Sequence, residues 1–227
     1  MAEVVKIITD FLIGTPVKIM TETARLFPDT LVIAPGIYAL FTLSIPFAVM
    51  FISLLEATAV FHLFRIAGSY LGSSSAYDTR TTYKACRTGF STTTLQDLSL
   101  FSSKVPSNFP SAPLYIISVA SAYIFSSLNA QSEQLQALGP AYSSRYYISL
   151  SLLCALILLF ALYRLYNTCD DFGVILGSIP IGLVVGALLL IQNSRLFGSE
   201  SVNLLGIPSL AGVTATGKSL YVCPTAS

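Results

Sequence analysis

Four long runs of mainly apolar residues, free of charged side chains, dominate the pattern of the chain. They are Thr30–Leu55, Pro113–Leu128, Tyr146–Tyr163 and Phe172–Ser194. At about 1.5 Å per residue the third run is roughly 27 Å long, close to the hydrocarbon thickness of a bilayer. Tyrosines flank both of its ends, as is typical of membrane interfaces. The pattern predicts an all-α membrane protein with about four transmembrane helices.

The last two runs are separated only by residues 164–171. So short a connection predicts that these two helices are antiparallel neighbours. In the first run the apolar pattern continues past Glu56 to Phe64, which predicts one long transmembrane helix over residues 30–64, kinked at Pro46. The second run, Pro113–Leu128, is the least apolar and the shortest of the four. Its small residues, such as Ser118 and Ala122, are of the kind that let helices approach closely.

Outside these runs the chain divides into three further parts. Residues 1–29 predict an amphipathic N-terminal segment with short helices over 2–13 and 16–28, lying in a membrane interface or covering the protein's own core. Residues 65–112 are rich in serine and threonine and predict a long extramembrane loop. Residues 195–227 form a C-terminal tail, in which Val213–Ala215 and Ser219–Cys223 could pair as a β-hairpin. The three membrane helices that precede the tail occupy residues 113–194.

Composition narrows the range of functions. The 227 residues are 54% hydrophobic and 10% charged, with a formal net charge of +1, so no basic surface indicates a nucleic-acid partner. His62 is the single histidine, and the four cysteines form no Cys-x-x-Cys pair. This pattern favours neither a metal site nor a His-based catalytic site, and we expect no cofactor and no enzyme activity.

Four glycines in the last run form two small-x-x-x-small motifs, Gly173/Gly177 and Gly182/Gly186. Such motifs allow close packing of membrane helices. Gly173 and Gly182 are nine residues apart, so at 100° per residue the two pairs lie on opposite faces of a straight helix. We expect packing against two neighbours, one of which could belong to another chain.

Two groups of ionisable residues allow both a structural and a functional interpretation. Glu56, His62 and Arg65 lie near the predicted end of the first helix, but 100° per residue spreads them around it, which favours an interfacial or neighbour-paired set over a polar site. Asp170 and Asp171 form a carboxylate pair suited to acid–base or metal chemistry. They also precede the last helix, where acidic residues cap the N-terminus, and capping is the preferred interpretation.

Residues 212–219 match the phosphate-binding pattern G-x-x-x-x-G-K-S, which requires a strand before the glycines and a helix after the serine. Pro224 and the last residues of the chain provide no such helix. We therefore expect no nucleotide binding despite the match.

Four transmembrane helices would place both ends of the chain on one side and divide the basic residues equally. Six are Lys6, Lys18, Arg25, Arg145, Arg195 and Lys218, and the other six are Arg65, Arg80, Lys84, Arg87, Lys104 and Arg164. The positive-inside rule then predicts no orientation. Cys86 and Cys169 share a side, and they are the expected disulfide if that side is oxidising. Free thiols are expected in a reducing compartment.

Three segments resemble membrane proteins of the nucleocytoplasmic large DNA viruses that infect algae. They are LFTLSIPFAVMFISLLEATAVFHLFR, LGPAYSSRYYISL, and NSRLFGSESVNLLGIPSL with GKSLYVC. The resemblance implies an integral protein of the virion inner membrane, a minor capsid component that bridges lipid and the capsid lattice. It carries no catalytic motif.

The pattern as a whole favours a structural membrane protein that anchors or bridges a membrane to a protein assembly. Residues 66–112 and 195–227 are the expected contacts to other capsid or membrane proteins. A small channel or transporter is the alternative, for which the prolines and the serines of the second run are the only signals. An intramembrane enzyme is the least favoured, because no nucleophile–base pair or metal-ligand set is present.

Overall fold

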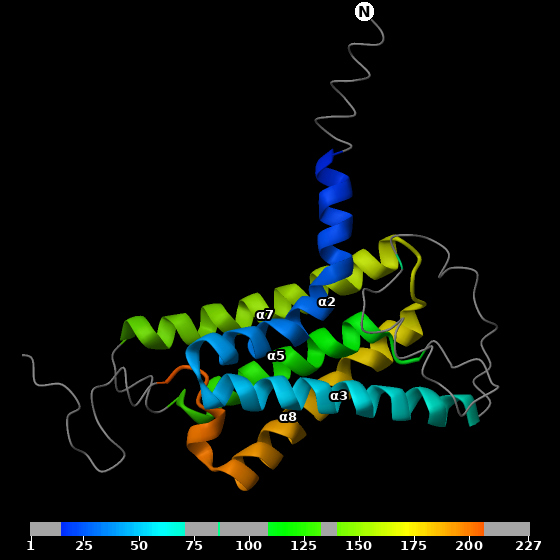
Figure 1. Cartoon of the computed structure of the whole chain (residues 1–227). Helices are drawn as coiled ribbons and strands as arrows, with labels where there is room; N and C mark the ends of the chain where they lie inside the picture. The colour runs from blue at the N-terminus through cyan, green and yellow to red at the C-terminus, as the bar shows by residue number, and fades with distance from the viewer. Residues whose placement is uncertain (1–14, 71–85, 87–108, 133–139, 207–227) are drawn as a thin grey trace, which may run out of the picture.

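The computed structural model describes residues 15–70, 86, 109–132 and 140–206 (Figure 1). This part of the chain folds into helices: α2 (Thr15–Thr42), α3 (Ile45–Tyr70), α5 (Ala112–Ala130), α7 (Pro140–Tyr166), α8 (Phe172–Phe197) and the short 3-10 helix η4 (Ser199–Val202). Five of them are long and apolar enough to cross a membrane. The all-α prediction is confirmed for the described residues, which contain no strand. The β-hairpin expected in the tail lies outside them.

The prediction of four helices is wrong, because the first run forms two helices instead of one. α2 ends at Thr42 and α3 begins at Ile45, and the two pack against each other as a hairpin. Leu43 turns the chain with a φ of 52°, in the left-handed region that few non-glycine residues adopt. The predicted kink at Pro46 is in fact a complete reversal of the chain.

The residues around the reversal explain why it occurs there. The carbonyl of Ser44 accepts a hydrogen bond from the amide of Ala48 (3.1 Å), so Ser44 stands where N-cap residues are favoured. Pro46 follows within the first turn of α3, where the missing amide hydrogen costs nothing. At the other end, the Thr42 hydroxyl donates to the carbonyl of Tyr38 (2.7 Å) in the last turn of α2.

α2 is bent, and its N-terminal half points away from the other helices (Figure 1). Pro28 and Pro35 lie inside the helix, and each removes a backbone hydrogen bond. The amphipathic helix expected over residues 16–28 is thus the first half of α2, continuous with the apolar half that pairs with α3. The helix expected over 2–13 lies outside the described residues.

α5 lies at the centre of the bundle, although its sequence is the least apolar of the original four runs. In its candidate membrane span 67% of the residues are buried, against 11–33% in the other four helices. It packs most extensively on α8 and also contacts α7, α3 and α2. Other helices surround α5, so its side chains pack mainly against protein. Serine and alanine are small enough to let the neighbouring helices approach closely, which explains their presence in α5.

The short connection between α7 and α8 does not make them packed neighbours, contrary to expectation. The two helices diverge from their turn, and α5 lies between them (Figure 1). A small apolar cluster joins all three near the turn, with Leu114 and Ile117 of α5, Phe160 of α7 and Ile175 of α8. Phe27 of α2 stacks on Phe160 in the same region, at 5.1 Å between ring centroids.

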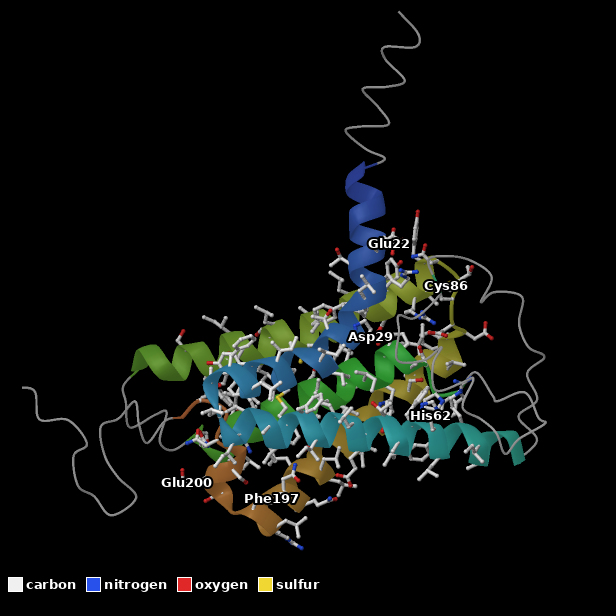
Figure 2. The ribbon with its side chains drawn as sticks, in the orientation of Figure 1. Glu22, Asp29, His62, Cys86, Phe197 and Glu200 are labelled. Carbon is white, nitrogen blue, oxygen red and sulfur yellow. A yellow bond between two sulfur atoms is a disulfide. The ribbon has the colours of Figure 1, made fainter. Side chains whose placement is uncertain are left out.

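The beginning of the tail folds back onto the bundle. Val202 of η4 is buried in the main apolar core with residues of α3, α5 and α8, and its carbonyl accepts a hydrogen bond from Ser127 (2.6 Å). Residues 199–203 therefore pack on the protein's own helices, while residues 207–227 lie outside the described part. Figure 2 shows Glu200 toward one end of the bundle, and His62 and Cys86 toward the other.

Candidate functional site

The turn between α7 and α8 is built by the last residues of α7. The amide of Thr168 donates to the carbonyl of Leu165 (3.0 Å) and the amide of Cys169 to that of Arg164 (2.9 Å), the two hydrogen bonds of a Schellman motif. Thr168 has a φ of 52°, at the position of this motif where glycine is usual. The motif holds Cys169 and Asp170 beside the end of α7.

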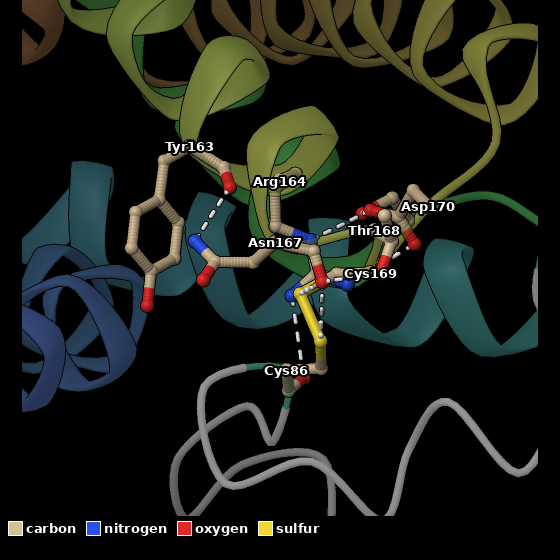
Figure 3. Close-up of a disulfide and its surroundings, with 8 residues drawn as sticks. Cys86, Tyr163, Arg164, Asn167, Thr168, Cys169 and Asp170 are labelled. Carbon is tan, nitrogen blue, oxygen red and sulfur yellow. Dashed lines mark hydrogen bonds and ion pairs between the residues drawn. A yellow bond between two sulfur atoms is a disulfide. The ribbon is translucent and has the colours of Figure 1, made fainter.

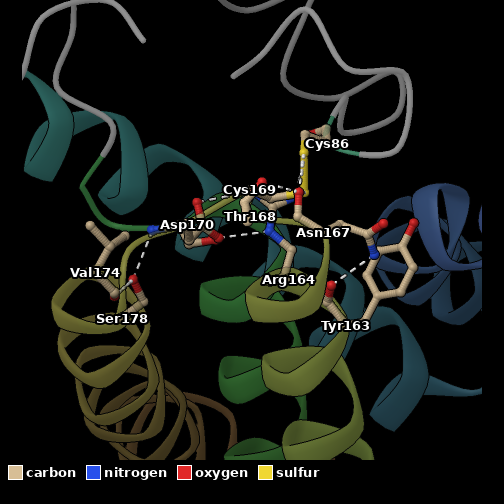
Figure 4. A network of polar contacts seen from close by, with 10 residues as sticks. Cys86, Tyr163, Arg164, Asn167, Thr168, Cys169, Asp170, Val174 and Ser178 are labelled. Atoms are coloured by element: carbon tan, nitrogen blue, oxygen red, sulfur yellow. Dashed lines mark hydrogen bonds and ion pairs between the residues drawn. A yellow bond between two sulfur atoms is a disulfide. The ribbon is translucent and has the colours of Figure 1, made fainter. Parts of the chain in front are cut away.

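Arg164 and Asp170 form a buried ion pair at this turn (Figure 4). Arg164 Nε lies 2.6 Å from one carboxylate oxygen of Asp170 and Nη2 lies 3.0 Å from the other, a bidentate geometry. The two side chains are only 10% and 7% exposed. The Ser111 hydroxyl also donates to Asp170, and the Ser111 amide donates to the Ser178 hydroxyl (2.7 Å). These bonds join the ends of α5, α7 and α8.

A disulfide ties a distant part of the chain to the same turn. Cys86 and Cys169 are bonded across 83 positions of sequence, and Arg164 Nη1 donates to the Cys86 carbonyl (3.2 Å) (Figure 3). Cys86 belongs to the segment between α3 and α5, so this segment is fastened to the end of the bundle near its middle. Cys154 is a free, exposed cysteine of α7, and Cys223 lies outside the described residues.

The geometry of this cluster suits a structural clamp. Arg164 hydrogen-bonds to both carboxylate oxygens of Asp170, and Ser111 donates to one of them. The expected capping role is wrong for Asp170, which is an ion-pair partner. Asp171 stands at the N-cap position of α8, but its side chain makes no capping hydrogen bond. Among the described residues no group of three His, Cys, Asp or Glu side chains could hold a metal ion.

The structure brings three of the four glycines against residues 109–122. A Cβ built on Gly186 would lie 2.3 Å from the Val119 carbonyl oxygen, and one on Gly182 would lie 2.7 Å from Ser118 Cβ. A Cβ on Gly177 would meet the Phe109 ring at 2.6 Å. Gly173 has open space around it. The close approach of α8 is thus to one neighbour, α5 and the residues leading into it, and not to two.

A second set of polar contacts joins α3, α5 and α8 inside the bundle. Asn193 Nδ2 donates to the Ser53 hydroxyl and to the Tyr123 hydroxyl (3.2 Å), and all three side chains are buried. The Tyr115 hydroxyl donates to the Ala57 carbonyl (3.0 Å). Polar groups surrounded by apolar side chains need such partners, so these contacts define how the three helices align.

Glu56, His62 and Arg65 do not form one site, as expected from their angular positions. Glu56 accepts a hydrogen bond from Gln192 of α8, at 3.1 and 3.3 Å to its two oxygens. Arg65 lies over the Phe61 ring, 5.6 Å from its centroid, and His62 contacts the same ring edge-on. His62 Nε2 is buried and has no hydrogen-bond partner among the described residues.

Sequence reasoning missed the partners in both clusters. In the sequence pattern Arg164 marks the boundary of an apolar run and adds to the charge count, but the pattern does not pair it with Asp170, six positions away across a turn. Gln192 and Asn193 fall within the last run because they carry no charge. Two adjacent amides within an apolar run are the signal that could have identified them. The phosphate-binding pattern at residues 212–219 lies outside the described residues.

No protein-family model, curated protein or solved structure matches this chain. The fold and its clusters therefore have to be interpreted from their own physical chemistry.

Proposed function

We propose that this chain is an integral membrane protein with a structural role, which anchors or bridges a membrane to a protein assembly. The observation that carries the proposal is the inside-out distribution of apolar residues. The α7 span has a mean hydropathy of 2.3 with only 11% of its residues buried. Leucines such as Leu152 and Leu158 are 63% and 60% exposed. An apolar helix that leaves most of its side chains exposed favours lipid as the surrounding solvent.

The packing of α5 supports a structural role over the alternative of a small channel or transporter. The axis of the bundle is occupied by fully buried side chains, among them Tyr115, Val119 and Tyr123. A transport path usually requires a polar route or interrupted helices around a site. The disulfide and the hydrogen bond from Arg164 join Cys86 to the end of the bundle, which supports a role in holding distant parts of the chain together.

The proposal includes no enzyme activity, no cofactor, and no nucleotide or nucleic-acid partner. The polar side chains around the Arg164–Asp170 pair hydrogen-bond to one another, and so do those around Asn193. Neither arrangement supports a nucleophile–base pair. The resemblance to membrane proteins of large algal DNA viruses makes the virion inner membrane the proposed location, with capsid or membrane proteins as partners of residues 66–112 and 195–227.

The experiment for this role combines membrane extraction with cross-linking in purified virions. We expect the protein to stay with membranes washed in alkaline carbonate, to dissolve in detergent, and to cross-link through residues 66–112 to a virion protein. Release by carbonate would refute the membrane location. Absence from virions, together with ion flux in liposomes, would favour the channel alternative.

The additional helix changes the expected orientation. With five crossings the ends of the chain lie on opposite sides, and the basic residues divide nine to three instead of six to six. The three are Arg145, Arg195 and Lys218, and the other nine of the twelve lie on the side of the N-terminal segment, the α3–α5 segment and the α7–α8 turn. The positive-inside rule then predicts that the nine-residue side is cytoplasmic.

Single reporter cysteines test this orientation in a background in which all four native cysteines, Cys86, Cys154, Cys169 and Cys223, are replaced by serine. We expect a cysteine placed at Ser69 to react with an impermeant maleimide only after the membrane is opened, and one at Ser199 to react in sealed cells. The opposite pattern would reverse the orientation, and equal reactivity would contradict five crossings. A cytoplasmic side is normally reducing, so thiol labelling of the unmodified sequence with and without a reductant shows whether the Cys86–Cys169 bond forms there.

A further inference from the structure

A hydrogen-bonded pair of polar side chains lies inside two candidate membrane spans. The α3 span runs from Ile45 to Ala67, so Glu56 stands 11 residues from each end (56 − 45 and 67 − 56). At 1.5 Å per residue each half is about 16 Å long, roughly half of a bilayer's hydrocarbon thickness. Gln192, within the α8 span, donates from Nε2 to both side-chain oxygens of Glu56 (3.1 and 3.3 Å). The two side chains therefore share one depth.

This pair is directed to the outside of the bundle. Glu56 is half-buried and Gln192 is exposed, and within the described part of the chain the side-chain carbonyl oxygen of Gln192 accepts no hydrogen bond. The adjacent amide behaves differently, because Asn193 is buried and donates to the hydroxyls of Ser53 and Tyr123. The bundle thus uses one amide for its own packing and presents the other on its surface.

Lipid is a poor neighbour for such a surface. An amide oxygen in hydrocarbon loses its hydrogen bonds to water and gains none in return, which costs free energy. Ionisable side chains within membrane helices almost always face protein or water, and glutamine side chains hydrogen-bond across helix contacts. The outward position of the Glu56–Gln192 pair therefore indicates a contact with a further helix.

Apolar side chains surround the pair on both helices. Ile52 and Leu63 of α3 are 59% and 64% exposed, and Leu188 and Leu196 of α8 are 57% and 67% exposed. At 100° per residue each of the four lies within about 40° of the polar residue on its own helix. We call this surface the α3–α8 face, made of Ile52, Glu56, Leu63, Leu188, Gln192 and Leu196. It combines area for apolar packing with polar groups near its centre.

We propose that the α3–α8 face joins two copies of this chain side by side in the membrane. The face is self-complementary, because it carries the acceptor oxygens of Glu56 and an amide at Gln192 that both donates and accepts. Two copies inserted in the same orientation and related by a twofold axis along the membrane normal present this face to each other at the same depth. The Gln192 amides can then hydrogen-bond across the axis. The inference goes beyond the structural role and rests on the proposed membrane location.

Cysteine cross-linking tests the contact in the full-length protein reconstituted in liposomes. Ala59 is exposed and lies three residues after Glu56, so its side chain borders the face. We expect Ala59→Cys, in a background of Cys154→Ser and Cys223→Ser, to form a disulfide-linked dimer when oxidised with copper phenanthroline. The matched control is the native Cys154, an exposed cysteine of α7, in a Cys223→Ser background. It should cross-link only as fast as random collisions allow.

The polar pair is tested by the dependence of the dimer yield on the protein-to-lipid ratio. We expect Gln192→Leu to weaken dimerisation about tenfold, the effect of losing about 1.4 kcal/mol, which is the size of one polar contact between membrane helices. Ser151→Leu is the matched control, because the exposed Ser151 hydroxyl donates to the Tyr147 carbonyl of its own helix (2.9 Å). It should leave the dimer yield unchanged. Circular dichroism checks that both variants keep their helix content.

Equal cross-linking of Ala59→Cys and Cys154 would refute the dimer. A yield that Gln192→Leu leaves unchanged would refute the role of the polar pair. With a photoreactive residue in place of Ala59, activated in native membranes, a product heavier or lighter than two copies would assign the face to another protein and overturn the proposal. Retention of the protein in carbonate-washed membranes without a dimer would refute this inference alone, whereas release by carbonate would refute the membrane location.

Discussion

Replacing Gly186 with leucine is expected to prevent the packing of α8 on α5 and to cause the largest loss of stability of any single change considered. Even the first added atom, Cβ, would stand 2.3 Å from the Val119 carbonyl oxygen and 2.9 Å from Ala122 Cβ. The obstacle is largely helix backbone, so α8 has to move away along its whole contact with α5. Overpacking of a well-packed core typically costs about 1–3 kcal/mol, and we expect Gly186→Ala near the upper end and Gly186→Leu beyond it.

Gly173→Ala and Gly173→Leu are the matched controls, because they change the same residue type on the same helix. A Cβ at Gly173 meets nothing within 4 Å. Alanine there should leave the protein equally or slightly more stable, since alanine favours helix by about 1 kcal/mol over glycine. The measurement is the midpoint temperature of unfolding in detergent by circular dichroism. Equal midpoints for Gly186→Leu and Gly173→Leu would show that α8 does not rest on α5 as described.

Removing one member of the Arg164–Asp170 pair is expected to have the second largest effect. Asp170→Asn leaves the Arg164 guanidinium buried and without its bidentate partner, which typically costs about 3–5 kcal/mol. Because Ser111 and Cys86 also bond to this pair, the start of α5 and the α3–α5 segment should loosen together. The measurement is the unfolding midpoint in detergent combined with the rate of limited proteolysis.

The surface pair Arg25–Glu22 provides the comparison for this prediction. Its nitrogen and oxygen are 2.9 Å apart, but its side chains are 27% and 38% exposed. Glu22→Gln should therefore change the free energy of unfolding by less than about 1 kcal/mol. The double change Arg164→Met with Asp170→Leu should recover much of the loss, because buried pairs are often replaceable by apolar residues. No recovery would indicate that the hydrogen bonds to Ser111 and Cys86 carry the stability.

Chain reversals were the hardest feature to predict. The stretch from Thr30 to Phe64 is mainly apolar, with no charged residue before Glu56, and neither hydropathy nor charge distinguishes one bent helix from two. Ser44 and Pro46 are the local signs of a helix start, yet a proline in an apolar run equally predicts a kink. Packing favours two helices over one bent helix, because the chain reversal lets the second half of α2 cover α3. Its consequences include the fifth helix, the nine-to-three division of basic residues and the mid-span position of Glu56.

The sequence alone determined that the chain forms helices long and apolar enough to cross a membrane, and it located three of the five, α5, α7 and α8. Long charge-free runs at helical length leave few alternatives, because an unpaired backbone cannot be buried in lipid and so must form helices. It also indicated that small residues in the runs that form α5 and α8 allow close packing of helices. Only the tertiary structure decided which helix is central, which glycines are in contact, and which polar groups meet. Those outcomes depend on side chains distant in sequence, such as Arg164 and Cys86 or Glu56 and Gln192, whose approach no local pattern encodes.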